Sequence, residues 1–410
     1  MTIRFFLLTL FTCTTSFYLQ GQNFTASFIK SVSFNSDENL NPIIPLGSKF
    51  LFSFDDLEAD QKNYHYLLQH CNYNWEVSAL KTTEFMNGFP SFELTEFENS
   101  FGTYQNYTHH QFEFPNRNSR IKISGNYLLT ILNDDDEICI QRRFIVYEPL
   151  VVIAGKVIRD RNLKNIDSKQ VVQFSIYHPD VIINNPAQEI KIKIIQNNDW
   201  NIEKNTIQPQ FYKKNEIAYN YNEETSFYGG NEFLNFDTKN FNGGNVNIMR
   251  TVLEDHYYHT YLFPNTVRNY LPYTYYPDIN GGFTIRTLNG NEVTTESEYT
   301  NVHFYLDATH HLKENEDIYI YGAFNNYAFT EENRLKYNEH TNYLETEMLF
   351  KQGFYNYTYV IKQHNKPVDI KSLEGSFQET ENNYTILAYY HPFGTRIGKI
   401  VGMATINSKN

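Results

Sequence analysis

The sequence predicts an all-β protein made of tandem antiparallel β-sandwich domains. The chain of 410 residues contains 33 Tyr and 33 Phe but only 5 Met and 2 Trp, and aromatic side chains favour the half-buried surface of a pleated sheet. Short runs of alternating apolar and polar residues recur along the chain, separated by the Asn, Gly, Asp and Thr that form turns. No long segment shows the 3.6-residue spacing of an amphipathic helix.

The first residues predict export. Arg4 supplies a short positive segment, residues 5–11 supply an apolar one, and Gly21 is small enough to precede a cleavage site. We therefore expect residues 1–21 to be a signal peptide. No later segment reaches the ~20 apolar residues of a transmembrane helix, so we expect no transmembrane segment in the mature chain.

The cysteines leave two questions open. Cys13 would end a lipoprotein signal in an alternative interpretation, although Thr12 is a poor residue before an acylated cysteine. Export to an oxidising compartment permits a disulfide between Cys71 and Cys139, while two cysteines in so long a chain are also typical of isolated buried thiols. No paired Cys or His spacing typical of a zinc site is present.

Residues 22–148 are expected to form the first sandwich. Alternation over residues 49–54 predicts a strand that ends in a turn at Asp55-Asp56, and residues 64–70 predict the next strand. A hairpin is expected where two alternating segments flank an acidic turn, at 126–132, 133–136 and 137–147. Glu148-Pro149 ends this pattern.

Residues 149–297 and 298–410 are expected to form a middle β domain with long loops and a C-terminal sandwich. In the middle domain, glycine pairs and polar runs make the stretch from 196 to 280 irregular. Its strands are expected at 171–177 and 189–196, and those of the C-terminal domain at 302–306, 317–322, 343–350 and 354–360. Residues 396–407 are expected to be the final strand of the last sandwich.

The charged residues exclude some functions and single out no site. The formal net charge of −13 and the lack of basic runs argue against nucleic acid or an anionic membrane surface as a partner. Asp134–Asp136 are interpreted as turn formers rather than calcium ligands. Adjacent residues on a strand point to opposite faces, so neither His109-His110 nor His310-His311 can chelate a metal from one face. No phosphate-binding loop and no nucleophile elbow occurs. We therefore predict no catalytic, cofactor-binding or metal-ligating residue, no cofactor, and no enzyme.

One stretch suggests a different function. Residues 321–327 and the hairpin 351–359 are similar to glycan-binding modules and early-set immunoglobulin-like domains. Phe324 and Tyr327 would stack on sugar rings if the chain were a glycan-binding periplasmic or surface protein. We prefer the interpretation that both rings pack the fold, because a resemblance of fold does not specify function. An envelope hydrolase with a dispersed active site is a further alternative.

The N-terminal third carries a series of phrases that resemble a known family. They are PIIPLGSKFLFSFDDL at 42–57, HCNYNW at 70–75, EFMNGF at 84–89, SFGT at 100–103 and SGNYLL at 124–129. In this order and spacing they are similar to the plug protein family of the type IX secretion system of Bacteroidetes. YYPDING at 275–281 and EYTNVHF at 298–304 fit as well. The resemblance is strongest from 42 to 149 and weakest from 200 to 250.

The resemblance implies a role rather than a reaction. The plug of this family sits at the periplasmic side of the outer-membrane β-barrel translocon and closes its pore while no cargo is engaged. The expected partner is therefore that barrel, and the expected location is the periplasm, in peripheral association with the translocon. A chain that was itself cargo would carry a dedicated C-terminal sorting domain, whereas residues 396–407 are expected to be a sandwich strand.

Overall fold

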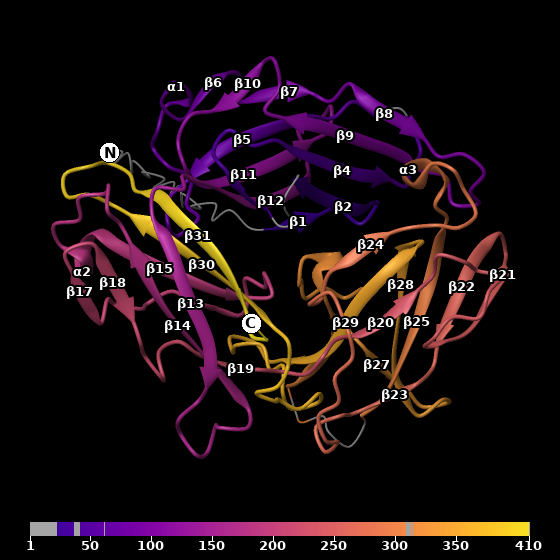
Figure 1. Cartoon of the computed structure of the whole chain (residues 1–410). Coiled ribbons are helices and arrows are strands. Elements are labelled where there is room, and N and C mark those ends of the chain that lie inside the picture. The colour runs from indigo at the N-terminus through magenta and orange to yellow at the C-terminus, as the bar shows by residue number, and fades with distance from the viewer. Residues whose placement is uncertain (1–22, 37–41, 61, 309–312, 314, 410) are drawn as a thin grey trace, which may run out of the picture.

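The computed structural model describes residues 23–36, 42–60, 62–308, 313 and 315–409 (Figure 1). The expected signal peptide and its cleavage site, Cys13, and His310-His311 lie outside these residues. Nearly all regular structure is strand, which confirms the all-β prediction. The α-helices are single turns of four residues: α1 (Thr82–Phe85), α2 (Pro186–Glu189) and α3 (Val293–Glu296). No helix among the described residues is long and apolar enough to cross a membrane.

The first sandwich, indigo to purple in Figure 1, packs two sheets around a core rich in phenylalanine. One sheet has the order β1-β12-β11-β5-β7, with β3 beside β12, and the other has the order β2-β4-β9-β8. β6 and β10 pair with each other at the edge of this sandwich. The strands are β1 (Phe24–Thr25), β2 (Ile29–Ser36), β3 (Ile43–Pro45), β4 (Phe50–Asp56), β5 (His65–Cys71), β6 (Met86–Gly88), β7 (Ser91–Glu93), β8 (Glu96–Asn99), β9 (Thr108–Phe114), β10 (Ser119–Ile121), β11 (Gly125–Leu132) and β12 (Ile138–Tyr147).

The acidic hairpin forms where the sequence predicts it. β11 and β12 pair antiparallel, and the carboxamide oxygen of Asn133 accepts hydrogen bonds from the backbone N–H groups of Asp135 and Glu137, at 3.1 and 2.9 Å. Asp136 takes a positive φ of 59°, a conformation that Asp tolerates better than most residues. The acidic residues of this loop therefore form a turn.

The predicted turn at Asp55-Asp56 is wrong. Both residues belong to β4, and both side chains are completely buried. Buried carboxylates require partners: Tyr64 donates its hydroxyl hydrogen to Asp56 at 2.7 Å, and Asp55 faces the third sandwich. Two acidic residues after an apolar run predict a turn, but the same pattern also arises where the end of a strand makes a buried ionic contact.

The second sandwich combines residues from two distant parts of the chain. Its sheets have the orders β13-β14-β18-β17, with β19 beside β14, and β16-β15-β30-β31. Figure 1 shows the yellow strands β30 and β31 against the magenta ones. The strands are β13 (Val152–Arg159), β14 (Lys169–Tyr177), β15 (Ile190–Gln196), β16 (Glu203–Lys204), β17 (Phe211–Lys213), β18 (Glu216–Tyr219), β19 (Ser226–Tyr228), β30 (Asn383–Tyr390) and β31 (Lys399–Asn407).

The third sandwich, orange in Figure 1, is inserted between β19 and β30. Its sheets have the orders β20-β29-β24, with β26 beside β29, and β21-β22-β25-β28-β27, with β23 beside β25. The strands are β20 (Leu234–Asp237), β21 (Ile248–Glu254), β22 (Tyr257–Leu262), β23 (Asn265–Thr266), β24 (Phe283–Ile285), β25 (Tyr299–Asp307), β26 (Asp317–Tyr321), β27 (Lys336–Asn338), β28 (Tyr343–Lys351) and β29 (Gly353–Lys362).

The expected boundary at 148/149 lies between the first and second sandwiches, whereas the expected boundary at 297/298 falls inside the third sandwich, between β24 and β25. The third sandwich begins at β20, and residues 396–407 complete the second sandwich rather than the third. Alternation identifies a strand but not its partner, and β30 pairs with β15 almost 200 residues earlier. The outgoing and returning segments lie together: Phe377 N–H donates to Gly230 O at 2.9 Å, and a Cβ on Gly229 would lie 2.0 Å from Phe377 O.

Candidate functional site

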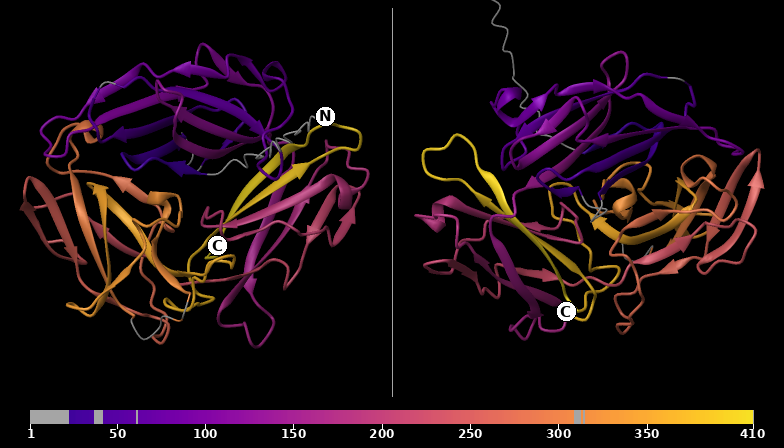
Figure 2. Two further views of the ribbon diagram at one scale, coloured as in Figure 1. Left: turned by 180° about the vertical axis from the view of Figure 1, so that it is seen from behind. Right: turned by 45° about the horizontal axis from the view of Figure 1, so that its top comes forward.

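Each sandwich contacts the other two, and Figures 1 and 2 show them arranged in a triangle. We call the three contacts the ionic junction (first with third sandwich), the apolar junction (first with second) and the neutral junction (second with third). Several buried charged and aromatic side chains that the sequence did not single out lie in these contacts.

The ionic junction is centred on Asp55 at the end of β4. One carboxylate oxygen of Asp55 accepts a hydrogen bond from His109 Nδ1 at 2.6 Å. The other accepts from Lys351 Nζ at 2.7 Å and from the Tyr299 hydroxyl at 2.6 Å. Asp55 and Lys351 have 0% and 2% exposure, so this ion pair joins the first and third sandwiches away from water.

Burial and charge act against each other in this pair. Burial alone would raise the pKa of Asp55, but the Lys351 ammonium and the hydrogen bond from His109 lower that pKa below its usual range. Burial lowers the pKa of Lys351, while the attraction of Asp55 opposes this shift. Both groups stay charged at neutral pH, because each stabilises the ionised form of the other.

Further contacts surround the ion pair. The Lys351 ammonium lies 4.1 Å from the centroid of the Tyr107 ring and donates to Thr294 O at 2.6 Å. The Tyr107 hydroxyl donates to Ser297 O at 2.9 Å, and Glu298 accepts the backbone N–H of Gln105 at 3.2 Å. The two sandwiches are therefore joined by a network that satisfies the buried charges.

The apolar junction is a separate hydrophobic cluster between the first and second sandwiches. Trp75 and Trp200 meet edge to face with ring centroids 5.4 Å apart, and the Arg143 guanidinium lies 4.8 Å above the Trp75 ring. A hydrogen bond of 2.9 Å runs from the Tyr389 hydroxyl to the Asn126 carboxamide oxygen. Burial of this apolar area stabilises the contact, and the ion pairs between these two sandwiches, Arg396 with Glu84 and Lys399 with Glu148, involve partly exposed side chains outside the apolar cluster.

The neutral junction contains a second buried aspartate. Asp199 accepts the hydroxyl hydrogen of Tyr321 at 2.6 Å, and Tyr327 donates to Asn197 O at 3.1 Å. None of the groups described as hydrogen-bonding Asp199 is a cation. Burial therefore raises the pKa of Asp199 to about 7, despite hydrogen bonds from Tyr321 and Asn201 that act in the opposite direction.

The two rings of the glycan-binding hypothesis pack the fold. Tyr327 is only 5% exposed and belongs to the neutral junction. Phe324 lies against Phe350, with ring centroids 5.1 Å apart. A sugar cannot stack on Tyr327 while this junction is closed. A cavity of about 260 Å³ does adjoin Phe324, between the start of the first sandwich and the third sandwich.

The two cysteines and the histidine pair His109-His110 are all buried in the fold. Cys71 and Cys139 are buried free thiols, which answers the question of the disulfide. Cys71 lies in the apolar junction and Cys139 in the core of the first sandwich, and burial raises the pKa of the Cys71 thiol to about 12. His109 serves the ionic junction, whereas His110 stacks on Phe54 inside the first sandwich at 5.1 Å.

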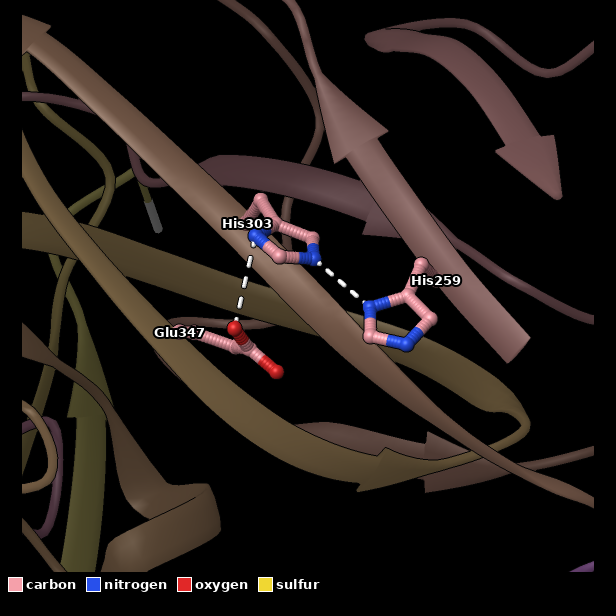
Figure 3. A group of neighbouring side chains, drawn as sticks. All are labelled: His259, His303 and Glu347. Atoms are coloured by element: carbon pink, nitrogen blue, oxygen red, sulfur yellow. Dashed lines mark hydrogen bonds and ion pairs between the residues drawn. The ribbon is translucent and has the colours of Figure 1, made fainter. Parts of the chain in front are cut away.

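Among the residues that the structure describes, two groups of side chains have the composition of a metal site. Asp56, Glu58 and Asp60 lie together, but the Lys62 ammonium already contacts all three carboxylates. The second group, His259, His303 and Glu347, brings two imidazoles and a carboxylate together on three strands (Figure 3). His259 and His303 are 44 positions apart in the sequence, and so are His303 and Glu347. Local spacing in the sequence therefore gave no sign of this group.

The fold and the junctions define the class of protein: three β-sandwiches held together by buried contacts into one body. The comparisons identify the family. Residues 29–148 match the model of the type 9 secretion system plug protein 1st domain. The chain belongs to the type IX secretion plug family. This family indicates a plug-like, structural role and an envelope-associated location.

A solved structure is similar to nearly the whole chain. A hypothetical protein from Parabacteroides merdae ATCC 43184 is similar with a TM-score of 0.89 and 30% identity, over 93% of this chain and 98% of its own. A biofilm-associated protein domain has a TM-score of 0.17 at 8% identity, over 94% of this chain and 59% of its own, which carries no structural argument. None of the curated proteins compared with the chain matches it.

Proposed function

We propose that this chain is the non-catalytic plug subunit that binds the periplasmic side of the outer-membrane type IX translocon barrel. It closes the pore when no cargo is engaged. Family membership supports this role, and the observation that carries it is the closure of all three junctions. A stopper must resist deformation, and three sandwiches with pairwise buried contacts move as one body.

The exposed side chains of the first sandwich are suited to contact with the barrel. The segment 89–104 presents Phe89, Phe97, Phe101 and Tyr104, and Phe101 is 77% exposed. Aromatic residues are enriched in the centres of protein interfaces, where they bury a large area at a small entropic cost. We assign this segment to the contact with the translocon, and the chain to the periplasm in peripheral association with the outer membrane.

A pull-down tests the proposal. The tagged chain is recovered from gently solubilised outer membranes, and its partners are identified by mass spectrometry. One very large barrel protein is expected at equal stoichiometry. The double variant Phe97→Ala/Phe101→Ala should recover several-fold less barrel, because truncation of aromatic residues at an interface centre typically costs about 1–2 kcal/mol or more each.

Phe393→Ala is the matched control. Phe393 is 94% exposed and lies on the second sandwich, away from the proposed contact segment, so its recovery of the barrel should equal that of the unchanged chain. If the unchanged chain recovers no membrane protein with or without cargo production, the proposed role is wrong. If the double variant binds as well as Phe393→Ala, the contact lies elsewhere.

A further inference from the structure

The outer face of the third sandwich brings His259, His303 and Glu347 together (Figure 3). They lie on β22, β25 and β28, which are neighbours in one sheet. His303 and Glu347 are directly opposite in the antiparallel pair β25–β28. The flanking residues Val302 and Phe304 are completely buried, so His303 points away from the core. His259 Nδ1 lies 3.0 Å from His303 Nε2, and His303 Nδ1 lies 3.7 Å from a Glu347 carboxylate oxygen.

We propose that these three residues bind a divalent transition metal ion, with zinc as the ion that fits them best. His259 Nδ1 and His303 Nε2 are the nitrogen ligands, and the Glu347 carboxylate is the oxygen ligand. Two histidines and one carboxylate are a common zinc donor set, which leaves a position for water. This binding site is independent of the plug role.

The distances fit such an ion. Zinc bonds to imidazole nitrogen are about 2.0–2.1 Å long, so two nitrogens on one zinc ion lie about 3 Å apart or slightly more. The observed separation of 3.0 Å needs almost no movement of the strands. One ligand atom from each of the three residues lies within 4.8 Å of the others. The Glu347 oxygen lies beside His303 Nδ1 and not Nε2, so the carboxylate has to rotate towards Nε2 to reach the metal, and its 47% side-chain exposure allows this rotation.

The surroundings hold the ligands and favour a cation. The Tyr261 ring stacks on His303, with centroids 4.3 Å apart and planes 6° apart, which fixes the orientation of the imidazole. The carboxylates of Glu254 and Glu345 add negative charge near His303. The Arg250 guanidinium on this face lies 4.3 Å from the centroid of the Tyr261 ring.

The other group of carboxylates shows the difference between the two sites. The Lys62 ammonium lies 3.4 Å from both Asp56 and Asp60 and also contacts Glu58. A side-chain cation already contacts every carboxylate of that cluster, and a metal would have to displace it. In the histidine group a metal replaces the hydrogen bond between the two rings and the contact of Glu347 with His303, and imidazoles are preferred ligands of zinc.

The test is a titration of the chelator-treated mature chain with zinc alone, followed by calorimetry and elemental analysis. One equivalent of zinc should bind the unchanged chain. His259→Gln and His303→Gln should each weaken binding by at least about 10-fold, since even loss of an outer-shell partner costs that much. Glu347→Gln should weaken it too, and it changes a half-exposed residue that the fold does not need.

His364→Ala is the control, because His364 is an exposed histidine on a loop of the same sandwich. It should bind zinc as tightly as the unchanged chain. Circular dichroism and the thermal midpoint without zinc establish that each variant folds. The proposal is overturned if the unchanged chain takes up no zinc, or if Glu347→Gln and both histidine variants bind zinc as tightly as His364→Ala.

Discussion

The ionic and neutral junctions each bury an aspartate at a contact between sandwiches, and the two carboxyl groups behave in opposite ways. Asp55 faces an ammonium and an imidazole, and its pKa is lowered. Asp199 faces hydroxyl and amide groups, and its pKa is raised to about 7. Both have essentially no contact with water. Burial therefore does not set the charge of a buried carboxyl group by itself; the charge of its partners decides between two outcomes.

The difference teaches how each contact responds to pH. The folded pKa of Asp55 lies below its unfolded value, so Asp55 contributes stability that is present above about pH 4 and is lost as pH falls through the folded pKa. The folded pKa of Asp199 lies above its unfolded value of 3.8. The cost of ionising Asp199 is therefore fully present above pH 7 and disappears as pH falls from 7 towards 4.

Removing the cation of the ionic junction should have the largest effect. Lys351→Met leaves the Asp55 carboxylate buried without its ammonium partner, which is expected to lower the free energy of unfolding by about 3–5 kcal/mol. Urea denaturation at pH 7 measures this loss. The double variant Asp55→Asn/Lys351→Met should be clearly more stable than Lys351→Met, because no unpaired charge remains. Equal stability of the two variants would contradict an ionised Asp55.

The structure of the strands was largely predictable, whereas the junctions were not. Alternation placed β4, β5, β11, β12 and β28 because each buries one face within its own sandwich. The Asp55–Lys351 contact joins residues 296 positions apart, and nothing near either residue in the sequence marks it. The same holds for His259 and His303, which become neighbours only through the parallel pair β22–β25. The expected boundary at 297/298 falls inside the inserted sandwich for this reason, because the partners of the strands, and not their positions in the sequence, define that sandwich.

A neutral replacement in the neutral junction should have a smaller, pH-dependent effect. Asp199→Asn keeps an oxygen that accepts from Tyr321 but cannot ionise. Relative to the unchanged chain it should therefore raise the thermal midpoint at pH 8 and lose most of that advantage at pH 5, where folded Asp199 is protonated but the unfolded carboxyl group is still ionised. Thermal midpoints from pH 5 to 8 measure the effect. A difference between the two chains that does not change with pH would show that Asp199 does not titrate in this range.

A substitution in the apolar junction should have the smallest effect on stability. Because this effect should not depend on pH, it is the reference for the substitutions in the other two junctions. Tyr389→Phe removes the hydroxyl that donates to Asn126 but keeps the ring in the cluster with Trp75. The loss should be about 1 kcal/mol in the free energy of unfolding, the usual net worth of one hydrogen bond, and it should not change between pH 5 and pH 8, because neither partner titrates there. Urea denaturation at both pH values measures it. A loss as large as that of Lys351→Met would mean that polar contacts, rather than packing, hold the first and second sandwiches together, and the distinction between an ionic and an apolar junction would then be wrong.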